Sequence, residues 1–261
     1  MVWLTNDMPP EGVERCKRYG VETVFVEANL RDHGNKQRHW EMLRWMATNL
    51  HRGFTHALTI DARDVVFLDN PFNYKPIEGP GILTTAEATR YADCRWNARE
   101  AKRMMKDLRA DLPGYDSAWP VINGGHLAGP VRELMWAQLV RVGIDSCVPA
   151  DQARSGILTN WAKAQLIRVG IDSRKPVDQT TLGFLTNWVK DWNTLFRVVS
   201  VSEPWILHGH FYCNWKDQVT IEDGHKIKNR KGELYRLLHQ WDRQEVPIEI
   251  RNSILVKYGT E

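Results

Sequence analysis

The sequence predicts an α/β fold in which a mostly parallel sheet is flanked by helices. Strand-like and helix-like segments alternate from the first residues onward, an order that brings parallel strands together in one sheet. The apolar or β-branched runs lie at residues 2–4, 22–27 and 56–60, and the helix-compatible stretches at residues 11–19 and 36–50. With 43% hydrophobic and 26% charged residues, the chain can bury a sizeable core. We therefore expect one α/β domain over residues 1–261.

Each segment has a local reason. The first run is stopped by polar residues and by Pro9 and Pro10, whereas residues 22–27 have the β-branched, apolar character of a strand. Residues 36–50 place apolar side chains at helical spacing. Further along, we expect strands at residues 81–86, 121–122, 196–201 and 204–207, and helices at residues 97–110 and around the amphipathic set Leu234, Leu237, Leu238 and Trp241.

Charge and cysteine content narrow the class of protein. The net charge of +3 gives no strong attraction to nucleic acid or to anionic membranes. The four cysteines are too far apart for a CxxC pair or a zinc motif, so we expect reduced thiols in a cytoplasmic protein. There is no run of 18 apolar residues and no signal-peptide pattern, so we expect a soluble chain without a membrane span.

A tandem repeat interrupts the second half of the chain. Residues 137–163 and 164–190 are identical at 18 positions when aligned with a period of 27. Two copies are too few for a solenoid. We interpret them as a duplicated helix–loop–helix unit inserted into the domain, although an error in sequence assembly would give the same pattern.

Two carboxylates give the strongest chemical signal. Asp61 and Asp64 follow the strand predicted at residues 56–60, at the carboxyl end where open α/β sheets bind ligands. Their oxygens suit Mn²⁺ or Mg²⁺, and such an ion can bridge the phosphates of a sugar nucleotide. The alternative is that they only cap a helix or end the strand.

Two further segments fit such a site. His208 and His210 follow an apolar run, and a neutral imidazole can complete a metal shell, although an HxH pair is also common in structural roles. Asn123, Gly124 and Gly125 follow a predicted strand and precede a predicted helix. The glycines would let backbone approach a ligand closely, or simply form a turn.

Charged residues elsewhere are weaker candidates. Lys36 and Arg38 begin a predicted helix and suit phosphate oxygens, the alternative being solvated surface charge. Asp151 and Asp178 occupy equivalent places in the two repeats, either as helix N-caps or as an acceptor-side carboxylate. We favour Asp178 as the catalytic group because its helix is better fitted to a core, whereas Asp151 lies nearer in sequence to Asn123.

Taken in order, these motifs resemble the glycosyltransferase domain of the procollagen lysyl hydroxylase and collagen glucosyltransferase family, within the GT-A (Rossmann-like) superfamily. The resemblance covers roughly residues 2–216. Its motifs are Thr5 and Asn6 after the first strand, residues 34–38 as Gly-x-Lys-x-Arg, residues 61–64 as DxxD, Ala86 and Glu87, residues 123–125 as Asn-Gly-Gly, an Asp-Gln pair, and His208 with Gly209.

The resemblance implies a site. It implies a Mn²⁺ ion held by Asp61, Asp64 and His208, with a UDP-sugar as donor. It also implies that Thr5, Asn6, Lys36 and Arg38 lie near the nucleotide or its phosphates, and that residues 123–125 lie near the donor sugar or the acceptor.

The sequence also departs from the family. The Asp-Gln unit is doubled, His210 and Phe211 differ from the residues that follow His-Gly in the family, and residues 237–243 have no counterpart. No hydroxylase domain is present in the sequence, so we expect an acceptor other than collagen.

We therefore expect a metal-dependent glycosyltransferase that moves a hexose or pentose from a UDP-sugar to an acceptor hydroxyl. The acceptor would be a glycan or a hydroxymethylated base in phage-type DNA. One alternative is a nucleotidyltransferase, which would be expected to have a glycine-rich basic loop after its first strand, where this chain has residues 5–9. Another is a non-catalytic sugar-binding module with structural aspartates.

Overall fold

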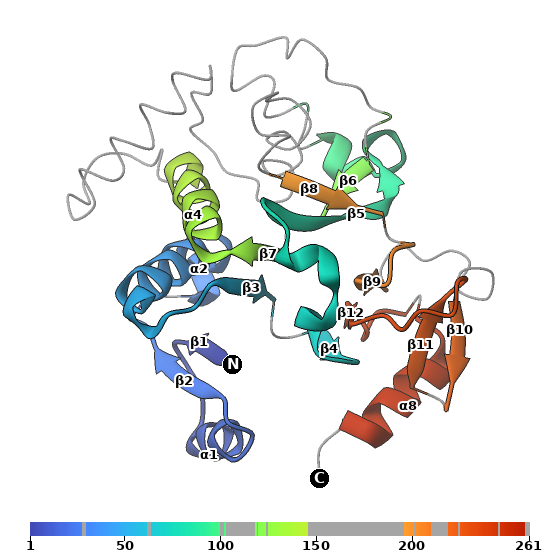
Figure 1. The fold of residues 1–261 in the computed structure, drawn as a ribbon, viewed down its shortest axis with the longest axis horizontal. Helices are drawn as coiled ribbons and strands as arrows, with labels where there is room; N and C mark the ends of the chain where they lie inside the picture. The colour runs from blue at the N-terminus through green and yellow to red at the C-terminus, as the bar shows by residue number, and fades with distance from the viewer. Residues whose placement is uncertain are drawn as a thin grey trace.

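A computed structural model describes a protein of four layers (Figure 1). The described residues are 1–27, 30–61, 64–99, 102, 118, 120–123, 125–145, 196–200, 202–209, 219–223, 225–244 and 246–258. In order, the layers are a pair of helices, a five-stranded sheet, a three-stranded sheet, and a hairpin with a final helix.

The chain begins with a strand–helix–strand–helix segment, as the sequence predicts. The elements are β1 (Val2–Thr5), α1 (Pro10–Arg18), β2 (Glu22–Phe25) and α2 (Leu30–Thr48). The first helix has a proline in its first turn, where the missing N–H costs no hydrogen bond. Strands β1 and β2 pair in parallel, with Val2 opposite Glu22 and Thr5 opposite Phe25.

The five-stranded sheet corrects the expected strand directions. It contains β3 (His56–Ile60), β5 (Ile82–Arg90), β6 (Pro120–Ile122), β7 (His126–Pro130) and β8 (Phe196–Val199). The pairs β3–β7, β5–β7 and β5–β6 are antiparallel, and β5–β8 is parallel. The prediction of a mostly parallel sheet is therefore wrong for these strands. The prediction fails because β6 and β7 both run opposite to β3, β5 and β8, and β7 lies between β3 and β5.

Strands β6 and β7 lie along the same neighbour. Ala86 of β5 is opposite Ile122, and Leu83 of β5 is opposite Ala128. Strands β6 and β7 thus form a nearly continuous antiparallel partner of β5, which is interrupted between Ile122 and His126. The sequence analysis placed a helix directly after residues 123–125; instead β7 follows, and α4 (Val131–Asp145) begins after it.

The three-stranded sheet contains β4 (Val65–Phe67), β9 (Ile206–His208) and β12 (Leu237–His239), with β12 in the centre. The helix expected around residues 234–241 is therefore wrong. Leu237 and Leu238 are both fully buried, but on opposite faces, because they belong to different core clusters. A short strand covered on both faces has no polar alternation, so its apolar spacing can mimic that of a helix.

Successive side chains of the five-stranded sheet pack against the layers on its two opposite faces. Ile82 and Leu127 pack with Met46 of α2 and Leu134 of α4, whereas Leu83 and its neighbours face the three-stranded sheet. The outer face of that sheet packs against the hairpin β10 (Val219–Glu222) and β11 (Lys226–Asn229) and against α8 (Ile248–Tyr258). The two inner sheets therefore lie face to face between the helical layers.

Several predictions fall partly or wholly outside the described residues. The start of the repeat continues helix α4 to Asp145, but the remainder of residues 137–190 is not described. Of the helix predicted at residues 97–110, the first residues are helical and the rest lies outside the description. Cys16 and Cys94 are free thiols. Within the described ranges, no helix has the length and apolar character to cross a bilayer.

Candidate functional site

The site lies at one edge of the two facing sheets, where strand ends from both come together. Asp61 is the first residue after β3, and its backbone N–H donates to the carbonyl of Gly125 over 2.8 Å. Because β7 runs antiparallel to β3, the carboxyl end of β3 adjoins residues 123–126. The Arg38 guanidinium from α2 forms an ion pair with the Asp61 carboxylate. Asp61 is therefore positioned by a sheet edge on one side and a helix on the other.

Asp64 lies at the corresponding edge of the three-stranded sheet. It directly precedes β4, and its carbonyl accepts a hydrogen bond from the N–H of Gln240 over 2.6 Å. Its carboxylate is largely buried, with one oxygen 3.6 Å from His239 Nε2 and the other 3.8 Å from an Arg243 nitrogen. Both distances are longer than those of hydrogen bonds, and of the two partners Arg243 carries the opposite charge.

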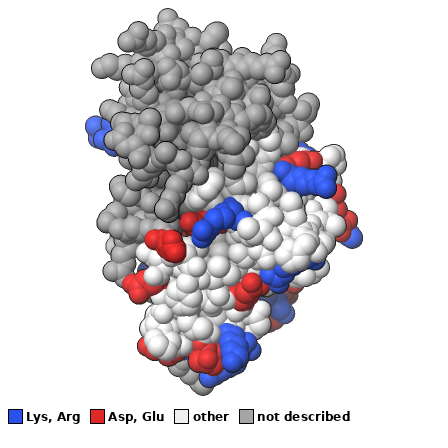
Figure 2. Space-filling model, turned by 90° about the vertical axis from the view of Figure 1, so that its left-hand side faces the viewer, with Lys and Arg blue, Asp and Glu red and all other residues white. Residues whose placement is uncertain are grey.

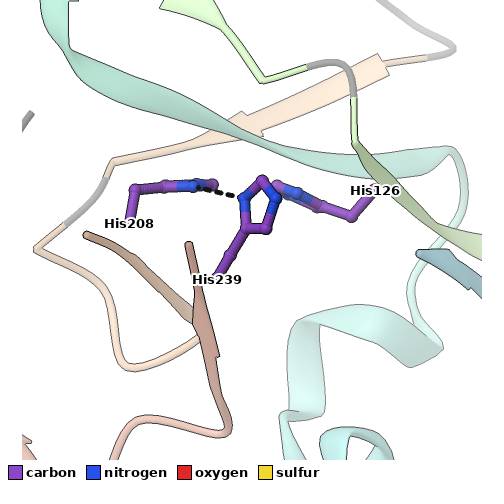
Figure 3. A group of neighbouring side chains, drawn as sticks. All are labelled: His126, His208 and His239. Carbon is purple, nitrogen blue, oxygen red and sulfur yellow. Dashed lines mark hydrogen bonds between the residues drawn. The ribbon is translucent and has the colours of Figure 1, made fainter. Parts of the chain in front are cut away.

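Two histidines end the parallel strands β9 and β12. His208 and His239 are register partners, so their side chains leave the same face of the sheet. Their Nδ1 atoms are 3.0 Å apart, as the dashed line in Figure 3 marks. His239 therefore lies between Asp64 and His208, and it connects the acidic edge of the site to the buried core.

A polar chain holds the third histidine, His126. Asn123 Oδ1 lies 3.1 Å from His126 Nδ1 and also accepts the Gly125 N–H over 2.8 Å. The amide nitrogen of Asn123 donates to Glu87 Oε1 over 2.9 Å, and His126 Nε2 lies 3.0 Å from the Thr85 hydroxyl. Asn123 and Gly125 lie between β6 and β7, His126 begins β7, and Thr85 and Glu87 belong to the neighbouring strand β5. The network fixes the His126 ring, which stacks on His208 with centroids 5.4 Å apart.

Burial controls the charge of the two paired imidazoles. Burial lowers the pKa of His208 well below its ordinary value, and the neighbouring His239 and His126 lower it further. Burial also lowers the pKa of His239, although Asp64 and Asp61 act in the opposite direction. Both rings are therefore neutral at pH 7, the state in which imidazole binds metal ions.

Because Gly125 has no side chain, other groups of the site can approach its backbone closely. A Cβ atom placed there would lie 2.6 Å from Asp61 Oδ2 and 3.2 Å from both Asn123 Oδ1 and His239 Cε1. The acidic group, the amide and the imidazole thus surround one glycine. Residues from β3, β12 and the β6–β7 interruption converge on the same volume.

The structure brings together much of the set that the sequence suggested. Arg38, Asp61, Asp64, Asn123, Gly125 and His208 all lie in this region. Thr5 and Asn6 lie at the carboxyl end of β1, where the Thr5 hydroxyl accepts the Asp7 N–H over 3.2 Å. Lys36 is in α2, but its side chain is not described. Gly124, His210, Asp151 and Asp178 lie outside the described residues.

Four site residues were missed by sequence reasoning. Glu87 was noted only as part of a motif, and His126, His239 and Arg243 were not identified. His239 and Arg243 lie in the tail, which has no counterpart in the family that the sequence resembles. Because a helix was expected there, these two residues were not predicted to lie at the site. His126 directly follows residues 123–125, and this adjacency was the one available signal.

Chemically, the site can combine hard oxygen ligands, neutral nitrogen ligands and a cationic guanidinium. Asp61 and Asp64 offer carboxylate oxygens, the ligands that magnesium and manganese ions prefer, and the histidines offer nitrogens, which suit softer ions. Three described histidines, His126, His208 and His239, form a group whose ligand atoms all lie within 4.8 Å of one another. Comparison with protein-family models and with curated proteins finds no match for the chain.

Proposed function

We propose that this protein is a metal-dependent glycosyltransferase that uses a UDP-sugar and transfers the sugar to an acceptor hydroxyl. The observation that carries the proposal is the convergence of Asp61 and Asp64 on the edge of His239 beside Gly125. A Cβ atom on Gly125 would lie 2.6 Å from Asp61 Oδ2 and 3.2 Å from His239 Cε1, and an Asp64 oxygen lies 3.6 Å from His239 Nε2, so both carboxylates are near the ring. Two carboxylates at the ends of neighbouring strands suit a Mn²⁺ or Mg²⁺ ion that also binds a diphosphate.

The residues present fit such an ion. Asp61 and Asp64 would supply the oxygen ligands, and the phosphates of the donor would supply others. The ion, when bound, would offset the negative charge of the departing diphosphate. His208, the third ligand expected from the sequence, lies behind His239 as seen from Asp64, so the two carboxylates carry the donor-site proposal.

Arg38 adds a second function to this edge. Its guanidinium neutralises Asp61. A divalent ion bound by Asp61 would take over that neutralisation, and the planar guanidinium would then be available to phosphate oxygens. Asn123 and Gly125 would border the donor sugar, because Gly125 has no side chain and both are fixed by hydrogen bonds.

The fold supports the same proposal. Strands β3, β5 and β8 run in one direction, with the metal-binding carboxylates at the carboxyl end of β3. Ligands of open α/β sheets bind at this end of the strands. We therefore propose a GT-A-like donor domain in which β7 is the reversed strand.

The acceptor is proposed to be a glycan. On the face in Figure 2, the described acidic and basic side chains are interspersed, and they form no continuous basic track there. Binding to a DNA backbone relies on many phosphate contacts from Lys and Arg. A hydroxymethylated base in DNA therefore remains a substrate for the assay panel rather than the proposed acceptor.

The first test is a thermal-shift experiment with UDP and GDP, each with and without Mn²⁺. A ligand that binds the native state raises the melting temperature by mass action. We expect UDP to stabilise the wild type only with Mn²⁺, and Asp64→Asn to abolish the shift. Asp69→Asn is the matched control, because Asp69 follows the other end of β4 and pairs with Arg236.

Each outcome separates the alternatives. A UDP shift that needs both Mn²⁺ and Asp64 would be followed by UDP-release assays with UDP-sugars and with glycan and hydroxymethylated-DNA acceptors. Stabilisation by a free saccharide without nucleotide or metal would instead favour a sugar-binding module. Stabilisation by nucleoside triphosphates and Mg²⁺, with pyrophosphate release, would favour a nucleotidyltransferase. The absence of any nucleotide effect would contradict the proposal.

A further inference from the structure

The three buried histidines come from three separate elements. His208 ends β9, His239 ends β12 and His126 begins β7, so the group joins both inner sheets. Their ring centroids are between 5.2 and 6.4 Å apart. Figure 3 shows the rings turned toward one another, and all three side chains are buried. A core of this kind is ordinarily filled by apolar side chains, because a buried polar group costs free energy unless it has a partner.

One nitrogen of the group has no hydrogen-bond partner among the residues that the structure describes. His208 is 1% exposed, and its Nε2 atom is buried without a partner among the described residues. Leaving such an atom unsatisfied costs about 1–3 kcal/mol. A metal ion bound by this nitrogen would remove that cost.

The distances suit a small ion. A zinc ion bound about 2.0–2.1 Å from each nitrogen in tetrahedral geometry requires nitrogens about 3.3 Å apart. One ligand atom from each of the three rings can be chosen so that all three lie within 4.8 Å of one another. To reach the spacing that zinc requires, the ligand nitrogens would move closer together by about 1.5 Å at most, which ring rotation can supply.

The surroundings have the form of a second coordination shell. Ligand histidines usually hydrogen-bond through their other nitrogen to an oxygen acceptor, which fixes the ring. Asn123 Oδ1 and the Thr85 hydroxyl face the two nitrogens of His126, so an ion would replace one of these contacts while the other holds the ring, and Glu87 in turn holds Asn123. The Asp64 carboxylate faces His239 Nε2, which leaves His239 Nδ1 directed to His208.

We propose that His126, His208 and His239 form a binding site for a divalent late transition ion of the zinc class. It is distinct from the carboxylate site, because its ligands are nitrogens and because Asp64 contacts it through His239. Imidazole donors favour zinc, cobalt, nickel and copper ions over the manganese and magnesium ions preferred by carboxylates. Asp64 partly balances the positive charge that the ion brings into the core.

The experiment uses the full chain, stripped of metal with a chelator and titrated with Co²⁺ as a spectroscopic substitute for zinc. We expect intense visible bands, typical of four- or five-coordinate cobalt, which disappear on addition of Zn²⁺. His126→Gln should weaken Co²⁺ binding at least about 100-fold. The matched control, His51→Gln, changes an exposed histidine of the short helix Leu50–Arg52 and should bind as the wild type.

A second measurement keeps the test decisive if His126→Gln does not fold. Histidine ring nitrogens of the wild type are observed by ¹⁵N NMR with and without Zn²⁺. Three of the nine histidines should show the shifts of metal-bound nitrogens. Weak octahedral cobalt bands that His126→Gln leaves unchanged, or zinc shifts at other histidines, would overturn the assignment.

The outcome is separable from that of the proposed function. Asp64→Asn should abolish the Mn²⁺-dependent UDP shift, yet weaken Co²⁺ binding only about 10–100-fold, as expected for a second-shell change. His126→Gln should have its main effect on Co²⁺. Cobalt binding without any UDP effect would therefore retain the imidazole site and reject the donor site, and the reverse result would do the opposite.

Discussion

His208 and His239 are register partners in the parallel pair β9–β12, and their Nδ1 atoms lie 3.0 Å apart in the buried interior. One ring must donate the proton in this contact while both remain uncharged. The hydrogen bond is lost when the accepting Nδ1 takes up a proton.

This relationship predicts a loss of stability in mild acid. Burial lowers the pKa of both imidazoles, so below pH 6.5 the unfolded chain takes up protons that the native state does not. The stabilisation is complete above pH 6.5 and falls as the pH decreases, by about 1.4 kcal/mol per pH unit for each histidine. Urea unfolding of metal-free protein between pH 7.5 and 5.5 measures the slope. His208→Gln should flatten it, and an unchanged slope would contradict the prediction.

Gly125→Ala should damage the donor site more than the fold. The added Cβ would lie 2.6 Å from Asp61 Oδ2, so the carboxylate must move. Overpacking of this kind costs about 1–3 kcal/mol. We expect the Mn²⁺-dependent UDP shift to disappear in a thermal-shift assay.

The control for Gly125→Ala is Gly232→Ala. Gly232 has φ +79° and open space around it, so alanine there should lower stability by about 1–2 kcal/mol and leave the UDP shift intact. If Gly125→Ala retained full UDP stabilisation, Gly125 would not border the donor.

Asn123→Asp should destabilise the protein, and Glu87→Gln should rescue it. Asn123 Nδ2 donates to Glu87 Oε1 over 2.9 Å between two buried side chains, so an aspartate would place like charges together. We expect a loss of about 2–4 kcal/mol in urea unfolding for the single variant. In the double variant the glutamine amide donates to the aspartate, and most of the loss should be recovered. Equal stability of the single and double variants would refute a direct contact.

Gly209→Ala should weaken the packing around β9 and β12. Its Cβ would lie 2.2 Å from the carbonyl oxygen of Gln240 and 2.5 Å from Val246 Cγ2. A backbone neighbour cannot rotate away, so we expect a loss of about 3 kcal/mol, at the upper end for overpacking. Circular dichroism melting curves measure this directly, and a melting temperature equal to that of the wild type would show that the two segments are farther apart.

Local patterns predicted most of the early elements. Residues 22–27 and 56–60 contain the β-branched and apolar runs of β2 and β3, and α2 has apolar side chains at helical spacing. The position of Asp61 directly after a strand was predicted for the same reason, because the end of an apolar strand is visible in the sequence. Local chemistry decides such features, so neighbouring residues suffice to locate them.

Features that depend on pairing between distant segments were not predictable. Leu237 and Leu238 fit a helix by spacing, and their burial on two opposite faces became evident only with β4 and β9 on either side. The closeness of His208 and His239 depends on strand register across 31 residues. The reversal at β7 likewise depends on which strand enters between β3 and β5, and no local residue preference specifies that choice.

The central place of β12 in its sheet has a consequence for how the protein matures during synthesis. Strands β4 and β9 leave the ribosome before β12, and among the described strands each pairs with β12 and not with the other. Strand β12 can therefore position Asp64 and His208 only after Leu237–His239 has been synthesised. Pairings between segments so far apart form slowly, because the loops between them must first close. The nascent chain should thus remain inert until this late strand is added, so ligand-binding competence would appear in a single step near the end of folding.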